Sequence, residues 1–176
     1  GCRVSASRWG RTETWRPDGQ DFHFMRSGCH STYTAASVLR DLSDVLALVN
    51  PDTVYVTAPG DCHGDHDALG RFTTQAVAAM ENPPALYYYL IHADRTDIWP
   101  ERDAERFRLP PMAADHPLLR CAAERRPLPD GFPPAEKYSL IQSYTSQDPA
   151  AYNGYLLAFA KNDELVFRVE RLPSRT

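Results

Sequence analysis

Between residues 54 and 80, a β-branched run, a polar loop and an amphipathic run follow one another. The run Val54–Thr57 predicts a buried strand, since β-branched residues suit a pleated surface. The apolar spacing through residues 68–80 predicts a helix that begins at Asp65 or Asp67 and ends near Glu81. The loop between them, Asp61–His66, holds two histidines and two aspartates. Because α/β proteins place ligands where a strand ends in such a loop, this loop is the first candidate site.

The two histidines of the loop, His63 and His66, are three residues apart. At this spacing their imidazoles share one face of the first helical turn. Histidine is the commonest metal ligand, and a neighbouring carboxylate orients its ring or accepts a proton. The alternative is a polar helix start, capped by aspartate, that binds nothing.

The rest of the chain predicts alternating helices and strands. Leucines on one face predict a helix over residues 34–49, and a tyrosine-rich run predicts a strand over 86–91. We also expect a short strand at 22–25, helices at 136–144 and 150–160, and a closing strand at 165–169. This order is typical of βαβ units. The expected class is therefore α/β, with a mostly parallel sheet and flanking helices.

Eight of the fifteen prolines lie between residues 100 and 134. Proline lacks an amide donor and biases its predecessor away from helix. We therefore expect a long irregular excursion at about 99–134, with a short helix near Leu118–Glu124. Long loops of this kind are often functional covers or interaction segments. The length of 176 residues favours a single domain over the whole chain.

Composition excludes several classes of protein. The net charge of −4 gives no basic surplus, so nucleic acid is not expected as a partner. No apolar run reaches the roughly 20 residues that a membrane span needs, and no signal peptide is expected. The four cysteines show no CxxC spacing, which argues against a zinc knuckle. Whether they form disulfides or stay reduced is left open, and so is the compartment.

Three stretches together resemble the PIG-L/LmbE-like N-deacetylases, over roughly residues 34–165. The segment from Pro51 to His66 is similar to the family's "PD-x-V-hydrophobic…D-x-H-x-D-H" element. Tyr89–His92, followed by Trp99-Pro100, resembles a strand and loop of many bacterial members. Lys137 and the later Tyr144–Gln147 resemble the "K…Y-x-S-Q" element.

The resemblance implies a Rossmann-like sheet and a zinc-dependent hydrolase, with another divalent metal as an alternative. The reaction would be removal of an N-acetyl or other amide-linked acyl group from an amino-sugar or glycoconjugate. The family's HPDDE-type motif, which supplies two ligands and the catalytic aspartate, is absent from these 176 residues. The expectation is therefore that the first strand and the remaining ligands come from a further segment or a partner chain. The bacterial cytoplasm and the cell envelope both stay open as locations.

The resemblance also implies roles for individual residues. His66 would ligate the metal, and His63 would stabilise the oxyanion or protonate the leaving amine. Asp65 would fix the tautomer of a neighbouring histidine, whereas Asp61 would only shape the loop. His92 and Trp99 would contact the substrate; their alternatives are a backbone-bonded histidine and a core aromatic residue.

Two rival functions stay open. A metallo-β-lactamase-like hydrolase has the signature H-x-H-x-D-H, and Asp61 stands in place of its first histidine. That reading predicts a two-metal site. The other rival is a metal-free, degenerate module that binds carbohydrate or a partner chain. Metal analysis separates these functions.

Overall fold

The computed structural model describes residues 3–18, 21–94, 98–147 and 154–174. Its contacts divide the chain into two compact units, and the boundary falls inside helix α3 (Gly64–Ala79). We call the first the N-terminal unit; it consists of Gly1–Thr53, Arg71–Pro84 and Leu172–Thr176. We call the second the sheet unit; it consists of Val54–Gly70 and Ala85–Arg171. A single domain over 1–176 stays a prediction.

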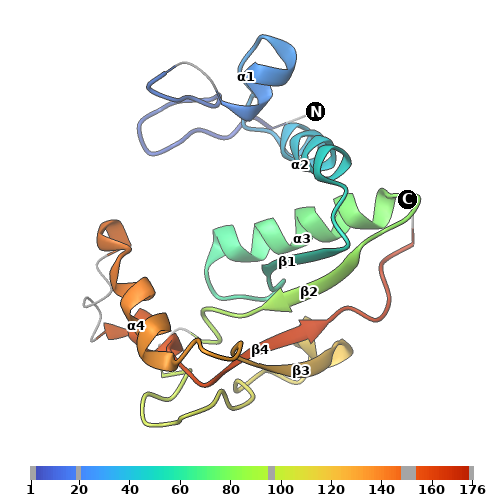
Figure 1. Ribbon diagram of the computed structural model, residues 1–176. Helices are drawn as coiled ribbons and strands as arrows, with labels where there is room; N and C mark the ends of the chain where they lie inside the picture. Colours follow the sequence, from blue (N-terminus) through green and yellow to red (C-terminus); the bar gives the residue numbers. More distant parts are fainter. Residues whose placement is uncertain (1–2, 19–20, 95–97, 148–153, 175–176) are drawn as a thin grey trace. The chain divides into compact units, whose positions relative to one another are not determined.

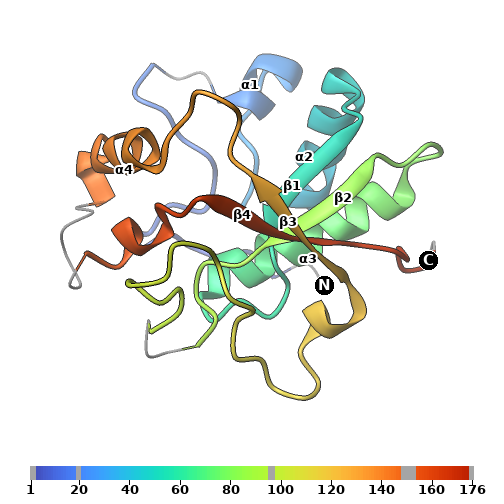
Figure 2. The same ribbon diagram turned by 60° about the horizontal axis from the view of Figure 1, so that its bottom comes forward.

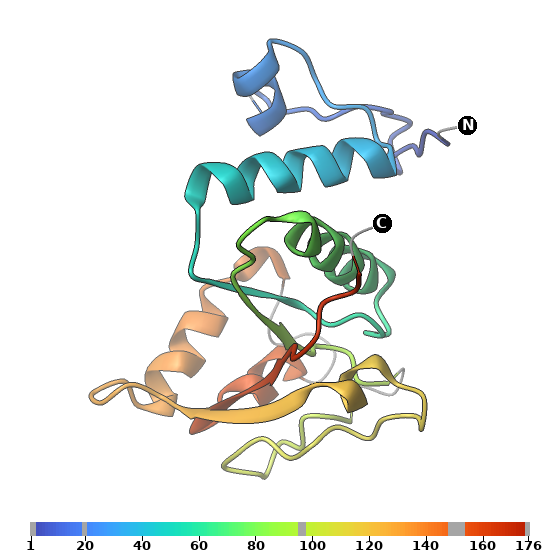
Figure 3. The ribbon, with the colours of Figure 1, turned by 90° about the vertical axis from the view of Figure 1, so that its right-hand side faces the viewer.

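A four-stranded mixed sheet is the centre of the fold. Its strands are β1 (Thr53–Thr57), β2 (Ala85–Tyr89), β3 (Ala122–Pro127) and β4 (Asp163–Arg168), in the order β1-β2-β4-β3. The arrows of β1 and β2 point the same way, and that of β4 points the opposite way (Figure 1). Figures 2 and 3 show β4 running beside β3. The protein is therefore a mixed α/β structure with flanking helices.

The expectation of a mostly parallel sheet is wrong for the described strands. β4 pairs antiparallel with β2 through Tyr88 and Phe167, and antiparallel with β3 through Ala123 and Phe167. A parallel pair needs a long crossover, usually a helix. Between β2 and β3 the described residues hold a 3₁₀ turn and no α-helix, and β3 pairs antiparallel with β4.

Three predicted helices are confirmed. Helix α2 (Ala35–Val49) begins after Thr34, whose side chain accepts the amide of Ser37, and it ends at Asn50, which has a positive φ of 46°. Helix α3 begins at Gly64, within the candidate segment Asp61–His66, one residue before the earlier of the two predicted starts. Helix α4 (Pro134–Gln142) matches the third prediction to within two residues at each end.

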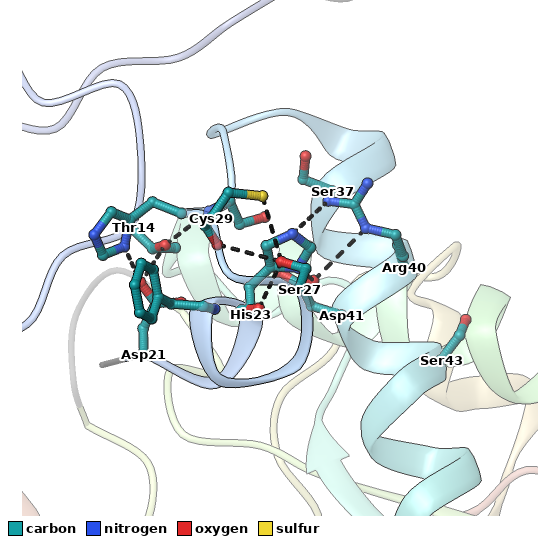
Figure 4. Close-up of polar contacts among 12 residues, drawn as sticks. Thr14, Asp21, His23, Ser27, Cys29, Ser37, Arg40, Asp41 and Ser43 are labelled. Atoms are coloured by element: carbon teal, nitrogen blue, oxygen red, sulfur yellow. Dashed lines mark hydrogen bonds and ion pairs between the residues drawn. The ribbon is translucent and has the colours of Figure 1, made fainter. Parts of the chain in front are cut away.

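The predicted strand at 22–25 is wrong, because these residues belong to helix α1 (Phe22–Ser27). Asp21 caps the helix by accepting the amide of Phe24, and Gly28 ends it with a φ of 76°. Helix α1 is tied to α2 by His23, whose Nδ1 lies 2.6 Å from Asp41 Oδ1. Figure 4 shows Arg40 and Asp41 of α2 pointing toward His23. The caps at Asp21 and Gly28 therefore favour a helix over a strand at these residues.

Two further predictions need correction within the second half of the chain. The short helix expected near Leu118–Glu124 is a 3₁₀ turn, Pro117–Arg120, and strand β3 follows it. Of the helix expected at 150–160, residues 150–153 lie outside the described residues, and the rest holds a 3₁₀ turn, Leu156–Phe159. The closing strand at 165–169 is confirmed as β4.

The core of the sheet unit forms on β2 and β4. Leu86, Tyr88, Leu165 and Phe167 are all less than a tenth exposed, and Phe167 is 1% exposed. Burial of such side chains stabilises each by about 1.5–3 kcal/mol. Among the described residues no helix has the length and apolar character needed to cross a membrane.

Candidate active site

Asp61 joins the loop after β1 to the segment after β2. Its Oδ1 accepts the amide of His63 at 2.9 Å, and its Oδ2 accepts the amides of Ile91 and His92, each at 3.0 Å. Asp61 is 5% exposed. A buried carboxylate needs such partners, because an unpaired one is costly to desolvate. Asp61 thus shapes the loop, as expected, and also fixes the position of His92.

His66 lies beside the same carboxylate. Its Nδ1 is 3.3 Å from Asp61 Oδ1, and this nitrogen is buried without a hydrogen bond among the described residues. Burial lowers the pKa of His66, and the positive charges of His63 and His92 lower it further, while Asp61 opposes both effects. The imidazole is therefore held toward its neutral form, which is the form that binds a metal or accepts a proton.

Three imidazoles gather at this point of the sheet unit. The ring centroids of His63, His66 and His92 are 4.6–5.7 Å apart, and Tyr155 stacks on His92 at 5.4 Å. The three histidines line one cavity of about 600 Å³, which we call the histidine cavity. Cavities of this size are typical of small-molecule sites.

An ion pair lines the same cavity. Lys137 Nζ of α4 lies 2.6 Å from Glu164 Oε1 of β4, and the lysine side chain is largely buried. The sequence singled out Lys137 only through the family resemblance, and it gave no signal for Glu164. Their pairing depends on how α4 is placed beside β4, which no local pattern records.

The structure separates the other predicted site residues. His92, which the resemblance implies as a substrate contact, lines the histidine cavity. Asp65 is exposed in the first turn of α3, and the carboxylate next to the His66 ring is Asp61. Trp99 is 4% exposed, donates its indole N–H to the carbonyl of Arg108, and packs against the Phe107 ring in a tilted arrangement. Trp99 lines a different cavity, described below.

The proline-rich excursion supports the candidate loop from one side. His116 Nδ1 accepts the amide of Leu118, so its proton is assigned to Nε2, which donates to the carbonyl of Gly60 at 3.2 Å. Gly60 has a φ of 93°, and a Cβ there would lie 2.9 Å from His116 Nε2. Glycine is therefore required at residue 60 by both backbone and space.

The described residues alone do not fit a complete zinc site. A catalytic zinc takes three protein ligands and a water. Within the described ranges, no group of three or more His, Cys, Asp or Glu side chains is arranged to hold a metal ion. The rings of His63 and His66 each lie within 30° of parallel to the His92 ring. The neutral imidazole of His66, beside a carboxylate, fits one ligand of such a site.

Comparison of the chain with protein-family models, curated proteins and solved structures finds no match.

Proposed function

We propose that this chain is a zinc-dependent N-deacetylase of the PIG-L/LmbE type, with a Rossmann-like sheet. It removes an acetyl or other amide-linked acyl group from an amino-sugar or glycoconjugate. The observation that carries the proposal is the position of Asp61, which lies 3.3 Å from His66 Nδ1 and also holds the amide of His92. One buried carboxylate thereby borders the His66 ring and fixes the backbone of His92.

The proposed metal ligand of this chain is His66. With Asp61 beside Nδ1, the nitrogen left for the metal is Nε2, as in carboxylate–histidine–zinc arrangements. Because the described residues do not complete the ligand set, we assign the remaining ligands to a segment or partner chain outside these residues. In hydrolases of this kind zinc supplies polarisation of the carbonyl and acidification of a bound water.

The chain's own side chains have distinct tasks in the proposed reaction. Asp61 is a positioning residue, since it acts on the substrate only through His66 and His92. His63 is exposed on the cavity wall and donates a hydrogen bond to the oxyanion, or a proton to the leaving amine. Lys137 and Glu164 are charged groups of the same wall that hydrogen-bond the hydroxyls of the sugar.

Zinc content tests the metal part of the proposal. Wild type, His66→Ala and His30→Ala, each prepared together with the segment or partner chain that supplies the remaining ligands, are dialysed against micromolar zinc, freed of excess metal and analysed by mass spectrometry. His30 is a matched control, because its side chain is 25% exposed against 28% for His66 and it belongs to the N-terminal unit. We expect zinc to be lost only from His66→Ala, with unchanged circular dichroism. Equal zinc in all three proteins contradicts the ligand assignment.

Amine release from N-acetylglucosamine and N-phenylacetylglucosamine, with zinc and the segment that supplies the remaining ligands present, tests the reaction itself. We expect release by the wild type and none by His66→Ala. A zinc-binding protein that releases no amine from any acylated amino sugar overturns the deacetylase proposal while leaving the metal site standing.

A second function is a metal-free module that binds carbohydrate through the histidine cavity. It is favoured by the absence of a three-ligand group among the described residues. Sugar binding without zinc uptake would support it. We do not propose the β-lactamase-like alternative. Asp61 stands where that signature has its first histidine ligand, and its carboxylate already accepts three backbone amides.

A further inference from the structure

A second cavity of about 360 Å³ lies in the sheet unit. We call it the aromatic cavity, since Tyr55, Tyr89, Trp99, Phe107 and Phe159 form much of its wall. Trp99 and Phe107 are each 4% exposed, and their ring centroids are 5.7 Å apart. Their rings are fixed by the core and present a preformed apolar wall. None of the roles assigned above uses this cavity.

The aromatic cavity adjoins the histidine cavity. Ile91, Phe159 and Glu164 line both. The chain also runs directly from one to the other, because Tyr89 lines the aromatic cavity and His92 the histidine cavity. Three residues of chain span at most about 10 Å. Burial raises the pKa of Tyr89, and the negative charge of Asp61 raises it further.

Charges around the aromatic cavity are balanced in pairs. Arg126 lies 3.2 Å from Glu124, and its guanidinium covers the Tyr87 ring at 4.3 Å. Glu164 is paired with Lys137. Each charged group at this wall thus has an opposite partner within the sheet unit, so the cavity offers no net charge to an ion. Its walls favour a neutral apolar ligand.

The volume decides how large that ligand is. A cavity of about 150 Å³ is enough to bind benzene, and the aromatic cavity is more than twice that size. An acetyl methyl group would leave most of it unfilled. The amine half of the substrate, being a polar sugar, suits the histidine cavity with its Lys137–Glu164 pair instead.

We propose that the aromatic cavity binds the acyl group of the substrate, and that this group is a neutral aryl or branched aliphatic acyl rather than acetyl. The assignment of the acyl half of the substrate to this cavity, and of the amine half to the histidine cavity, rests on the proposed amide hydrolysis. The preferred substrate class is then an N-arylacyl or N-branched-acyl amino sugar, cleaved at the histidines with its acyl group between Tyr89 and Trp99.

Binding to the full chain is measured first, with fluorobenzene as the probe and ¹⁹F NMR as the readout. Tyr89→Glu places a charge in the cavity wall at a side chain that is 36% exposed, and should weaken fluorobenzene binding at least tenfold. Tyr138→Glu is the matched control, because Tyr138 is 39% exposed and lies on α4 outside the aromatic cavity. Val166→Phe, which fills the cavity from β4, should also weaken binding. Circular dichroism checks the fold of each variant.

Competition then tests the acyl assignment without turnover, in the His66→Ala variant, from which no amine release is expected. We expect N-phenylacetylglucosamine to displace fluorobenzene and N-acetylglucosamine at the same concentration to leave it bound. Equal binding by Tyr89→Glu and Tyr138→Glu, or no displacement by the aryl amide, overturns the inference. Displacement by the aryl amide in a protein that hydrolyses neither amide overturns the proposed reaction but supports the cavity as the site of the acyl group.

Discussion

Asp61 Oδ2 accepts the backbone amide of His92 at 3.0 Å, although the two residues follow different strands. The same carboxylate accepts the amides of His63 and Ile91 and borders the His66 ring. The geometry of the three imidazoles therefore depends on one buried side chain. A loop and a strand end that are far apart in sequence are fixed to each other by hydrogen bonds to a charged acceptor, which are stronger than those to neutral acceptors.

Replacing Asp61 should damage both stability and the site. Asp61→Ala leaves three amide donors without their acceptor, and each buried unsatisfied donor costs about 1–3 kcal/mol. We expect the free energy of unfolding, measured in urea, to fall by about 3 kcal/mol or more. Asp65→Ala is the control, because Asp65 is exposed in the first turn of α3, and it should cost less than about 1 kcal/mol. Similar losses in both variants would refute the central role of Asp61.

Replacing His63 should affect turnover more than metal content. His63→Ala removes a donor to the developing oxyanion, which typically lowers kcat about a hundredfold or more. Because His66 is unchanged, zinc content measured by mass spectrometry should equal that of the wild type. Unchanged kcat with the preferred acyl substrate would remove His63 from the reaction.

The two glycines of α3 form a matched pair for testing how the helix meets β1. A Cβ at Gly70 would lie 2.4 Å from the Thr57 carbonyl oxygen and 2.8 Å from the Pro59 nitrogen. Gly70→Ala should therefore destabilise the protein by about 1–3 kcal/mol. At Gly64 nothing lies within 4 Å of the added carbon, so Gly64→Ala should be neutral or stabilising by up to about 1 kcal/mol. Thermal unfolding distinguishes the two, and equal melting temperatures would contradict the close helix–strand contact.

Acid should destabilise the N-terminal unit through Asp21. The hydrogen bond from Thr14 holds the pKa of Asp21 below its usual range, with further lowering by the Phe24 amide and by His30 and some opposition from burial. Because the folded pKa lies below the unfolded value of about 3.9, Asp21 contributes stability above pH 4 that is lost as the pH falls toward the folded pKa. Asp21→Asn should lower the melting temperature at pH 7. It should also flatten the acid limb of the stability curve, and an unchanged acid limb would exclude this carboxyl as its cause.

The helices of this chain were predictable because their signals are local. Leucine periodicity, the Thr34 cap and the Asn50-Pro51 stop define α2 within a few residues of sequence. Local signals were also present for α1, because Asp21 and Gly28 flank the helix. Phe22 and Phe24 are aromatic residues at a spacing of two, which favours a strand, and this pattern pointed the wrong way. Strand β3 gave almost no local signal, because its sequence of Ala, Glu, Arg and Pro has low strand propensity.

The spacing of His63 and His66 was set by the amino-acid order alone, since any helix starting at this loop brings residues three apart onto one face. Tertiary structure decided which other residues lie beside these two histidines. His92, Lys137, Tyr155 and Glu164 reach the histidines only because β4 inserts antiparallel between β2 and β3 and because Asp61 accepts amides from beyond β2. Pairing across long stretches of chain depends on total burial and hydrogen-bond satisfaction, which are properties of the assembled sheet and have no counterpart in a short window of sequence.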